Sequence, residues 1–185
     1  MKKLNFIIKC GLALLLLSFY SCESWLNVTP SDRLSEEMLF NDREGFVKAL
    51  NGVYIELNTN ELYGRNLTAG ALDVMGQYYS VASSSHAFYN YGGLVYTGND
   101  EKALFDNMWQ KCYAVIACCN TIIEKCDENK AGLSPVWRGS IKGEALALRA
   151  MLHFDMLRLF GPLTSELDKE SIPYQTNSDQ TVTPL

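Results

Sequence analysis

The stretch from Trp137 to Pro162 constrains the fold of this chain more than any other. Outside the N-terminal leader, it is the longest uninterrupted run of apolar residues with the helical spacing of about 3.6 residues. One stripe contains Ile141, Ala145, Leu148, Leu152, Met156 and Leu159, and a neighbouring stripe contains Leu146, Ala150, Phe154 and Leu157. A helix that is apolar on most sides needs neighbours on most sides. We therefore expect a central helix, with both stripes buried by the rest of the chain.

The flanking residues predict where this helix begins and ends. Ser134 can cap the first turn with its side-chain oxygen, and Pro135 suits that turn because the donor it lacks would have no partner there. Gly161 tolerates a left-handed closing conformation, and Pro162 cannot continue the hydrogen-bond ladder. The predicted helix covers residues 134–160.

Two further helices are predicted, at residues 41–57 and 100–129, because each carries an apolar face of helical period. In the first, Asn41 and Glu44 have the spacing of a capping box. A short turn separates the last two helices, so they should form an antiparallel hairpin. Trp109, followed by Tyr113 four residues later, also resembles the first helix of a tetratricopeptide unit. The sequence thus predicts a mainly α domain built on helical hairpins.

Residues 58–99 differ in kind from the helices on either side. Six glycines interrupt any helical pattern in this segment. It is also rich in aromatic residues: Tyr63, Tyr78, Tyr79, Phe88, Tyr89, Tyr91 and Tyr96. A tyrosine offers a flat apolar face and a polar tip. We predict a long irregular Tyr- and Gly-rich loop whose tyrosines either pack onto the helices or meet a ligand.

Residues 1–21 have the order of an export signal. Three lysines and no acidic residue accompany a short apolar core from Cys10 to Tyr20. Ser21 then precedes Cys22, an arrangement that resembles a lipobox, in which Cys22 becomes the lipidated N-terminus. The alternative is ordinary signal cleavage beside an incidental cysteine. We expect a lipoprotein signal peptide at 1–21, a helical domain at 22–185 and lipid attachment at Cys22.

The charge of the chain argues against nucleic acid as a partner. The net charge of −5 becomes −8 once the leader and its three lysines are removed. Phosphate contacts need a basic face, which such an acidic domain lacks. Outside the leader, no apolar run reaches the roughly 20 residues that span a bilayer.

No catalytic set, metal site or cofactor motif is recognisable. Cys112, Cys118, Cys119 and Cys126 lie on one predicted helix, too far apart or too strained to bridge, and are expected to be small buried hydrophobes. His86 and His153 cannot be placed in one site, and His153 suits a core or groove position. Glu144 and Asp155 are about 16 Å apart along one helix, too far for a glycosidase pair.

The central stretch resembles the signature helix of SusD/RagB-type proteins. The matching residues are Gly143, Glu144, Ala145, Leu148, Arg149, Ala150, Phe154, Asp155, Leu157, Arg158, Phe160 and Gly161. Shorter segments at 25–30, 109–120 and 172–174 also resemble this family. The resemblance covers nearly all of this chain but only the first part of a typical member. It implies a SusD-like N-terminal region, truncated before the C-terminal part.

Members of that family are outer-membrane lipoproteins that capture nutrients beside a TonB-dependent transporter. The resemblance therefore implies a lipid-anchored cell-surface protein that binds a glycan and passes it to a SusC-like partner. Loops from this part of the chain contribute to the ligand surface in the family. The candidates in this sequence are Tyr78, Tyr79, Tyr89 and Tyr91 for stacking, and Asp73, whose carboxylate can accept two sugar hydroxyls.

Two other functions remain open on the sequence. Tetratricopeptide-like hairpins can bind peptides or proteins along a groove, which would make the chain a scaffold at the outer membrane. A glycoside hydrolase is the third hypothesis, and the lack of a suitable acid pair weighs against it.

Overall fold

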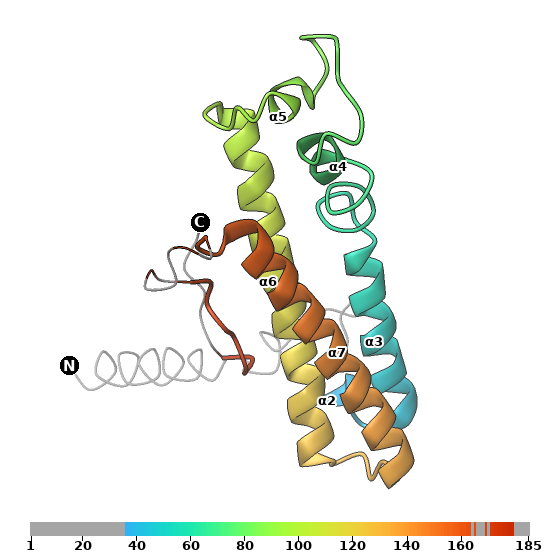
Figure 1. Cartoon of the computed structure of the whole chain (residues 1–185). Coiled ribbons are helices and arrows are strands. Elements are labelled where there is room, and N and C mark those ends of the chain that lie inside the picture. Colours follow the sequence, from blue (N-terminus) through green and yellow to red (C-terminus); the bar gives the residue numbers. More distant parts are fainter. Residues whose placement is uncertain (1–35, 164, 166–168, 170, 180–185) are drawn as a thin grey trace, which may run out of the picture. The chain divides into compact units, whose positions relative to one another are not determined.

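The computed structural model describes residues 36–163, 165, 169 and 171–179. These residues form helices and connecting segments without a β-strand, which confirms the mainly α prediction (Figure 1). The helices are α2 (Glu36–Leu39), α3 (Arg43–Leu57), α4 (Ala71–Met75), α5 (Tyr89–Gly92), α6 (Asn99–Glu128) and α7 (Pro135–Phe160). The leader and Cys22 lie outside the described residues. The tetratricopeptide-like character of the hairpins stays a prediction.

The start of α3 differs from the predicted capping box. Asp42, not Asn41, is the N-cap, and its Oδ1 accepts a hydrogen bond of 2.8 Å from the backbone N–H of Gly45. Asp42 has extended backbone angles, as an N-cap residue should. Asn41 instead belongs to the turn that joins α2 to α3. The cap is therefore one residue later than the sequence pattern indicates.

Helices α6 and α7 form the predicted antiparallel hairpin (Figure 1). Asn129 closes α6 in the left-handed conformation, with a φ of 47°. Its side chain also spans the turn: Oδ1 accepts from the backbone N–H of Leu133 at 2.8 Å, and Nδ2 donates to the carbonyl of Leu133 at 3.3 Å. Ser134 caps α7 as expected, accepting from the N–H of Trp137, and Pro135 is its first residue.

The centre of the domain is α6, which corrects the expectation that α7 is central. The three long helices all pack against one another, but α6 makes the most extensive contacts with the other two and buries residues along its whole length. Helix α7 buries one stripe, consisting of Ile141, Ala145, Leu148, Leu152 and Met156. Its second apolar stripe faces outward: Phe154 is 59% exposed, and Leu146 and Leu157 are also exposed. The prediction that Phe154 is buried is therefore wrong. A stripe is buried only if a neighbouring element covers it, and the described residues place none there.

The end of α7 also differs from the prediction. Gly161 has a φ of −73° and a ψ of 164°, so it leaves the helix in an extended rather than a left-handed conformation. Its N–H still donates to the carbonyl of Leu157 at 2.9 Å. A Cβ at position 161 would lie 2.4 Å from that same carbonyl oxygen. Close approach to the last turn, rather than a positive φ, therefore explains a glycine at this position.

Three of the four cysteines on α6 are buried, as predicted, but the prediction is wrong for Cys118, which is exposed. All four are free thiols. Burial raises the pKa of Cys112 and of Cys119 to about 12. These two thiols are therefore protonated at neutral pH and act as small apolar side chains, because only the thiolate is a strong nucleophile.

A strap formed by residues 172–178 lies against α6 and α7 through polar contacts. Tyr113 on α6 donates its hydroxyl to the carbonyl of Pro173 at 2.8 Å. Asn120 Nδ2 donates to the carbonyls of Gln175 and Asn177, at 3.4 and 3.1 Å. Because these donors come from a buried face of α6, the strap satisfies polar groups that would otherwise be costly to bury.

Candidate functional site

The Tyr- and Gly-rich segment lies at the end of the domain where α6 begins. It contains the two short helices α4 and α5, which pack against each other, and turns before and between them (Figure 1). Asn90 on α5 ties the segment to α6, because its Nδ2 donates to Glu101 Oε1 at 2.8 Å. Two hollows open beside Asn90, and this residue lines both of them.

The first hollow, which we call the Tyr79 hollow, has a volume of about 350 Å³. It is lined by Gln77, Tyr79, Ser80, Val81, Tyr89, Asn90, Gly92, Gly93 and Val95. Both tyrosines are predicted ligand residues, and their side chains are 44% and 42% exposed. This hollow therefore combines accessible aromatic faces with amide groups, the mixture that sugar recognition requires.

The walls of the Tyr79 hollow are held by hydrogen bonds to backbone. The hydroxyl of Tyr79 donates to the carbonyl of Ala69, which fixes the ring against the turn before α4. Gln77 Nε2 donates to the carbonyl of Gly92 at 2.9 Å and to that of Val74 at 3.3 Å. Gln77 itself has a φ of 59°, in the left-handed region that few non-glycine residues adopt. Backbone strain of this kind is often found at ligand sites.

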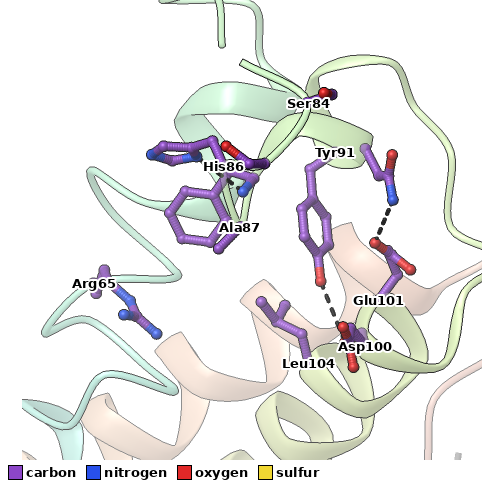
Figure 2. Close-up of a pocket in the computed structure, with 11 residues that line it drawn as sticks. Arg65, Ser84, His86, Ala87, Tyr91, Asp100, Glu101 and Leu104 are labelled. Carbon is purple, nitrogen blue, oxygen red and sulfur yellow. Dashed lines mark hydrogen bonds between the residues drawn. The ribbon is translucent and has the colours of Figure 1, made fainter. Parts of the chain in front are cut away.

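The second hollow, which we call the Arg65 hollow, has a volume of about 640 Å³ (Figure 2). It is lined by Arg65, Ser84, Ser85, His86, Ala87, Phe88, Asn90, Tyr91, Asp100, Glu101 and Leu104. Its residues come from the turns before α4, from α5 and the segment leading into it, and from the first turns of α6. The hollow thus depends on contacts between parts of the chain that are far apart in sequence.

Tyr91 is placed differently from the other predicted tyrosines. Its side chain is only 2% exposed, and its ring packs against those of Phe88, Tyr96 and Phe105. Its hydroxyl donates to the carbonyl of Asp100 at 3.4 Å, and burial raises its pKa to about 12. In this structure, Tyr91 forms a wall of the Arg65 hollow rather than an open stacking platform.

Tyr78 and Asp73 line neither hollow. Tyr78 is the most exposed of the predicted residues, at 82%, and projects from the turn after α4. Asp73 is partly buried on α4, and its carbonyl accepts from the N–H of Tyr78 at 3.0 Å. The ligand roles of Tyr78, Tyr79, Tyr89, Tyr91 and Asp73 therefore stay predictions, with only Tyr79 and Tyr89 lining the same hollow.

Sequence reasoning missed the charged residues of the Arg65 hollow. The guanidinium of Arg65 stacks over the ring of Phe88 at 5.7 Å, and its Nε donates to Asn66 Oδ1 at 3.2 Å. Glu101, the partner of Asn90, is only 6% exposed. The sequence signal is weak: a single arginine among glycines, and an acidic pair where a helix begins. Such acids usually serve the helix N-terminus.

The carboxylates considered for hydrolysis are already engaged in helix packing. Glu144 Oε1 accepts from the hydroxyl of Tyr54 at 2.7 Å, which links α7 to α3. Asp155 accepts from the hydroxyl of Tyr63 at 2.5 Å and pairs with Arg158 at 3.2 Å. The part of the chain that the structure describes contains no group of three or more potential metal ligands. No helix among those same residues is long and apolar enough to cross a bilayer.

The fold and the hollows define a helical domain that presents an irregular loop region with two hollows at one end. Residues 24–184 match the SusD-like family described as "Starch-binding associating with outer membrane", and the chain belongs to this family. It is similar to SusD-like protein P2 of Formosa agariphila, with 25% identity over 166 residues. That match covers 87% of this chain and 30% of the relative's length. No solved structure matches the chain.

These matches confirm the predicted family resemblance. The chain spans less than a third of the length of the relative that it matches. What a whole SusD-like protein binds and assembles with is therefore a proposal for this chain.

Proposed function

We propose that this chain binds an oligosaccharide at the end of the domain formed by α4, α5 and the start of α6. The observation that carries the proposal is the Tyr79 hollow, in which two exposed tyrosine rings lie beside the amides of Gln77 and Asn90. A sugar ring has apolar faces of C–H groups and a rim of hydroxyls. Aromatic faces can cover the former, and the amide oxygens of Gln77 and Asn90 can accept from the latter, because the Nε2 donors of Gln77 already serve backbone carbonyls.

The family match supports this proposal at a coarser level. Its description names starch binding and association with the outer membrane. Binding without catalysis agrees with the engaged carboxylates, because Glu144 and Asp155 serve helix contacts and lie on one helix rather than across a cleft. We propose that the chain is not an enzyme.

The first test is affinity electrophoresis of the 185-residue chain. Native gels would contain a neutral polysaccharide (amylopectin, laminarin or galactomannan) or an acidic one (polygalacturonate or alginate). At least one polysaccharide should retard the protein without release of reducing ends. If none of them retards it, glycan binding is wrong; if reducing ends accumulate, the chain is a hydrolase.

Single tyrosine variants then locate the site. Tyr89→Ala should weaken binding by about 2- to 12-fold, the equivalent of about 0.5–1.5 kcal/mol for an aromatic contact. Tyr54→Ala is a matched control, because Tyr54 is similarly exposed, at 46%, but lies on α3 away from both hollows. Equal loss in the two variants would indicate a stability effect rather than a ligand contact.

We also propose that Cys22 carries the lipid that holds the protein at the outer membrane, facing the cell surface. A TonB-dependent, SusC-like transporter would receive the captured glycan. The basic and apolar leader followed by Ser21 and Cys22 supports the anchor. The family description supports the outer-membrane location. Co-purification of the detergent-extracted protein with a TonB-dependent transporter would test the partner.

A scaffold function is the second candidate, and the outward stripe of α7 favours it. Leu146, Phe154 and Leu157 are exposed together on one helix face, and large exposed apolar patches often mark contact surfaces. Phe154→Glu separates the two functions. A scaffold would lose its protein partner in this variant and show no glycan binding, whereas a glycan-binding protein would keep its polysaccharide affinity.

A further inference from the structure

We infer that the Arg65 hollow is a second sugar subsite, which accepts a neutral sugar unit and rejects an acidic one. The inference rests on the proposed glycan binding and deepens it by naming the class of glycan. Asn90 lines both hollows, so a ligand that crosses Asn90 would occupy the two together.

The two sides of the hollow carry opposite charge. Figure 2 shows Arg65 on one side and Asp100 and Glu101 on the other, with Leu104 between them. Tyr91 contributes an apolar ring above Leu104, and Ala87 lies toward the Arg65 side. The hollow therefore has one wall that donates hydrogen bonds, one wall that accepts them and an apolar surface between.

The Arg65 side chain is held in place for binding. Stacking on Phe88 and the bond from Nε to Asn66 fix the guanidinium plane. Among the described residues, Arg65 takes part in no ion pair with a carboxylate. A guanidinium has five N–H donors, and the remaining four can serve a ligand.

The opposite wall can only accept hydrogen bonds or repel negative charge. Glu101 is buried and already accepts from Asn90, so its charge is fixed in the wall. Asp100 is exposed beside it, and a carboxylate has no hydrogen to donate at neutral pH. Two negative charges thus face one positive charge across the hollow.

A neutral sugar satisfies both walls, because some of its hydroxyls can accept from Arg65 while others donate to Asp100. A uronate or sulfated sugar could pair with Arg65, but its charge would also lie near Asp100 and Glu101. A negative charge on a ligand in this hollow would share it with two carboxylates, one of them buried, and like charges repel more strongly where water is excluded. The hollow therefore discriminates by charge, in favour of the neutral ligand.

The experiment compares one glycan in two charge states. Amylopectin and its C6-oxidised form share a backbone, but in the second the hydroxymethyl groups have become carboxylates. The wild-type chain should bind amylopectin at least about tenfold more tightly than the oxidised form. Asp100→Asn should reduce the ratio of the two affinities severalfold, because the oxidised form should bind more tightly once this carboxylate is neutral. Arg65→Gln should weaken amylopectin binding by about tenfold, the loss expected for hydrogen bonds to a charged group.

Asp106→Asn is the matched control, because it removes the same charge from α6 outside the Arg65 hollow and should leave the ratio unchanged. Thermal melts of each variant exclude unfolding as the cause. The inference is overturned if polygalacturonate or oxidised amylopectin binds more tightly than neutral glycans. It is also overturned if Asp100→Asn and Asp106→Asn change the ratio equally. Absence of binding to every polysaccharide, by contrast, refutes glycan binding itself.

Discussion

The backbone N–H of Gln175 donates a hydrogen bond of 3.1 Å to Nε2 of His153, in the buried contact between the strap and α7. Because Nε2 accepts, the neutral ring carries its proton on Nδ1, which lies 2.9 Å from the carbonyl of Arg149. The ring is packed between Tyr113 of α6 and Tyr174 of the strap. His153 can hold the strap in this way only while it is neutral.

Acidification should therefore destabilise the domain through His153. Burial lowers the pKa of His153 below 6.5, and the positive charge of Arg149 acts in the same direction. In the unfolded chain His153 is therefore protonated at a higher pH than in the folded chain. Its contribution to stability is fully present above the unfolded pKa and is lost as the pH falls from that value through the folded pKa. The free energy of unfolding should drop between about pH 7.5 and 5. In His153→Gln, which cannot be protonated, the drop should be smaller.

The control for this pH effect is His86→Gln, at the exposed histidine of the loop region. It removes the other histidine but leaves the contact between His153 and the strap intact, so the pH dependence of His153→Gln is compared with that of this variant. Carboxylates also titrate toward the acid end of this range. Both histidine variants keep every carboxylate, so a difference between the two variants comes from the histidines. A His153→Gln variant whose stability falls as steeply as that of the wild type would show that His153 does not govern the acid response.

Removal of Arg149 should release the strap without unfolding the helices. Its Nη1 donates to Asn120 Oδ1 at 2.7 Å and to the carbonyl of Thr176 at 3.1 Å. We expect Arg149→Met to cost about 1.5–3 kcal/mol, the usual range for hydrogen bonds to a charged group. Proteolysis within residues 172–178 should become faster. Arg158→Met, which removes an exposed arginine from the same helix, should leave proteolysis of the strap unchanged.

Leu152 and Phe154 test which stripe of α7 belongs to the core. Leu152 is fully buried, so Leu152→Ala should lower the free energy of unfolding by about 2–5 kcal/mol. Phe154 is mostly exposed, so Phe154→Ala should change it by no more than about 0.5 kcal/mol. Denaturant titrations would measure both. A larger loss in Phe154→Ala would mean that the second stripe is covered after all.

The helices can be predicted from sequence because local chemistry determines them. Ser134, Pro135 and the apolar period place α7 almost to the residue. The helical spacing of apolar residues does not show which of the two stripes another element covers. For that reason the prediction is correct for Leu152 and wrong for Phe154, and it makes α7 central instead of α6.

The candidate site is only partly predictable. Tyr79 and Tyr89 are recognisable because they stand in an aromatic and glycine-rich segment, and they do line one hollow. Their exposure relative to Tyr91 depends on how the segment packs against Phe105, which no local pattern reveals. Arg65 and Asp100 come to line one hollow only in the folded structure. Pairings of that kind carry no periodic signal in one sequence.

Lipid attachment is tested on the leader itself. Mass spectrometry of the membrane-extracted protein should find acyl chains on Cys22 and no residue before it, because several chains together hold a protein firmly in a bilayer. Cys22→Ala should move the protein from the membrane fraction to the soluble fraction. Wild-type protein that is processed but soluble and unacylated would contradict the anchor.

The most direct test of glycan binding at this end of the domain is hydrogen–deuterium exchange with and without the polysaccharide that retards the protein most. We expect slower exchange in residues 77–95 and around Arg65 when the glycan is present, since ligand contacts and loss of local opening protect these amides. Exchange in α3 and in the outward face of α7 should not change. Protection confined to α3 and α7, with residues 77–95 unaffected, would contradict the proposed site.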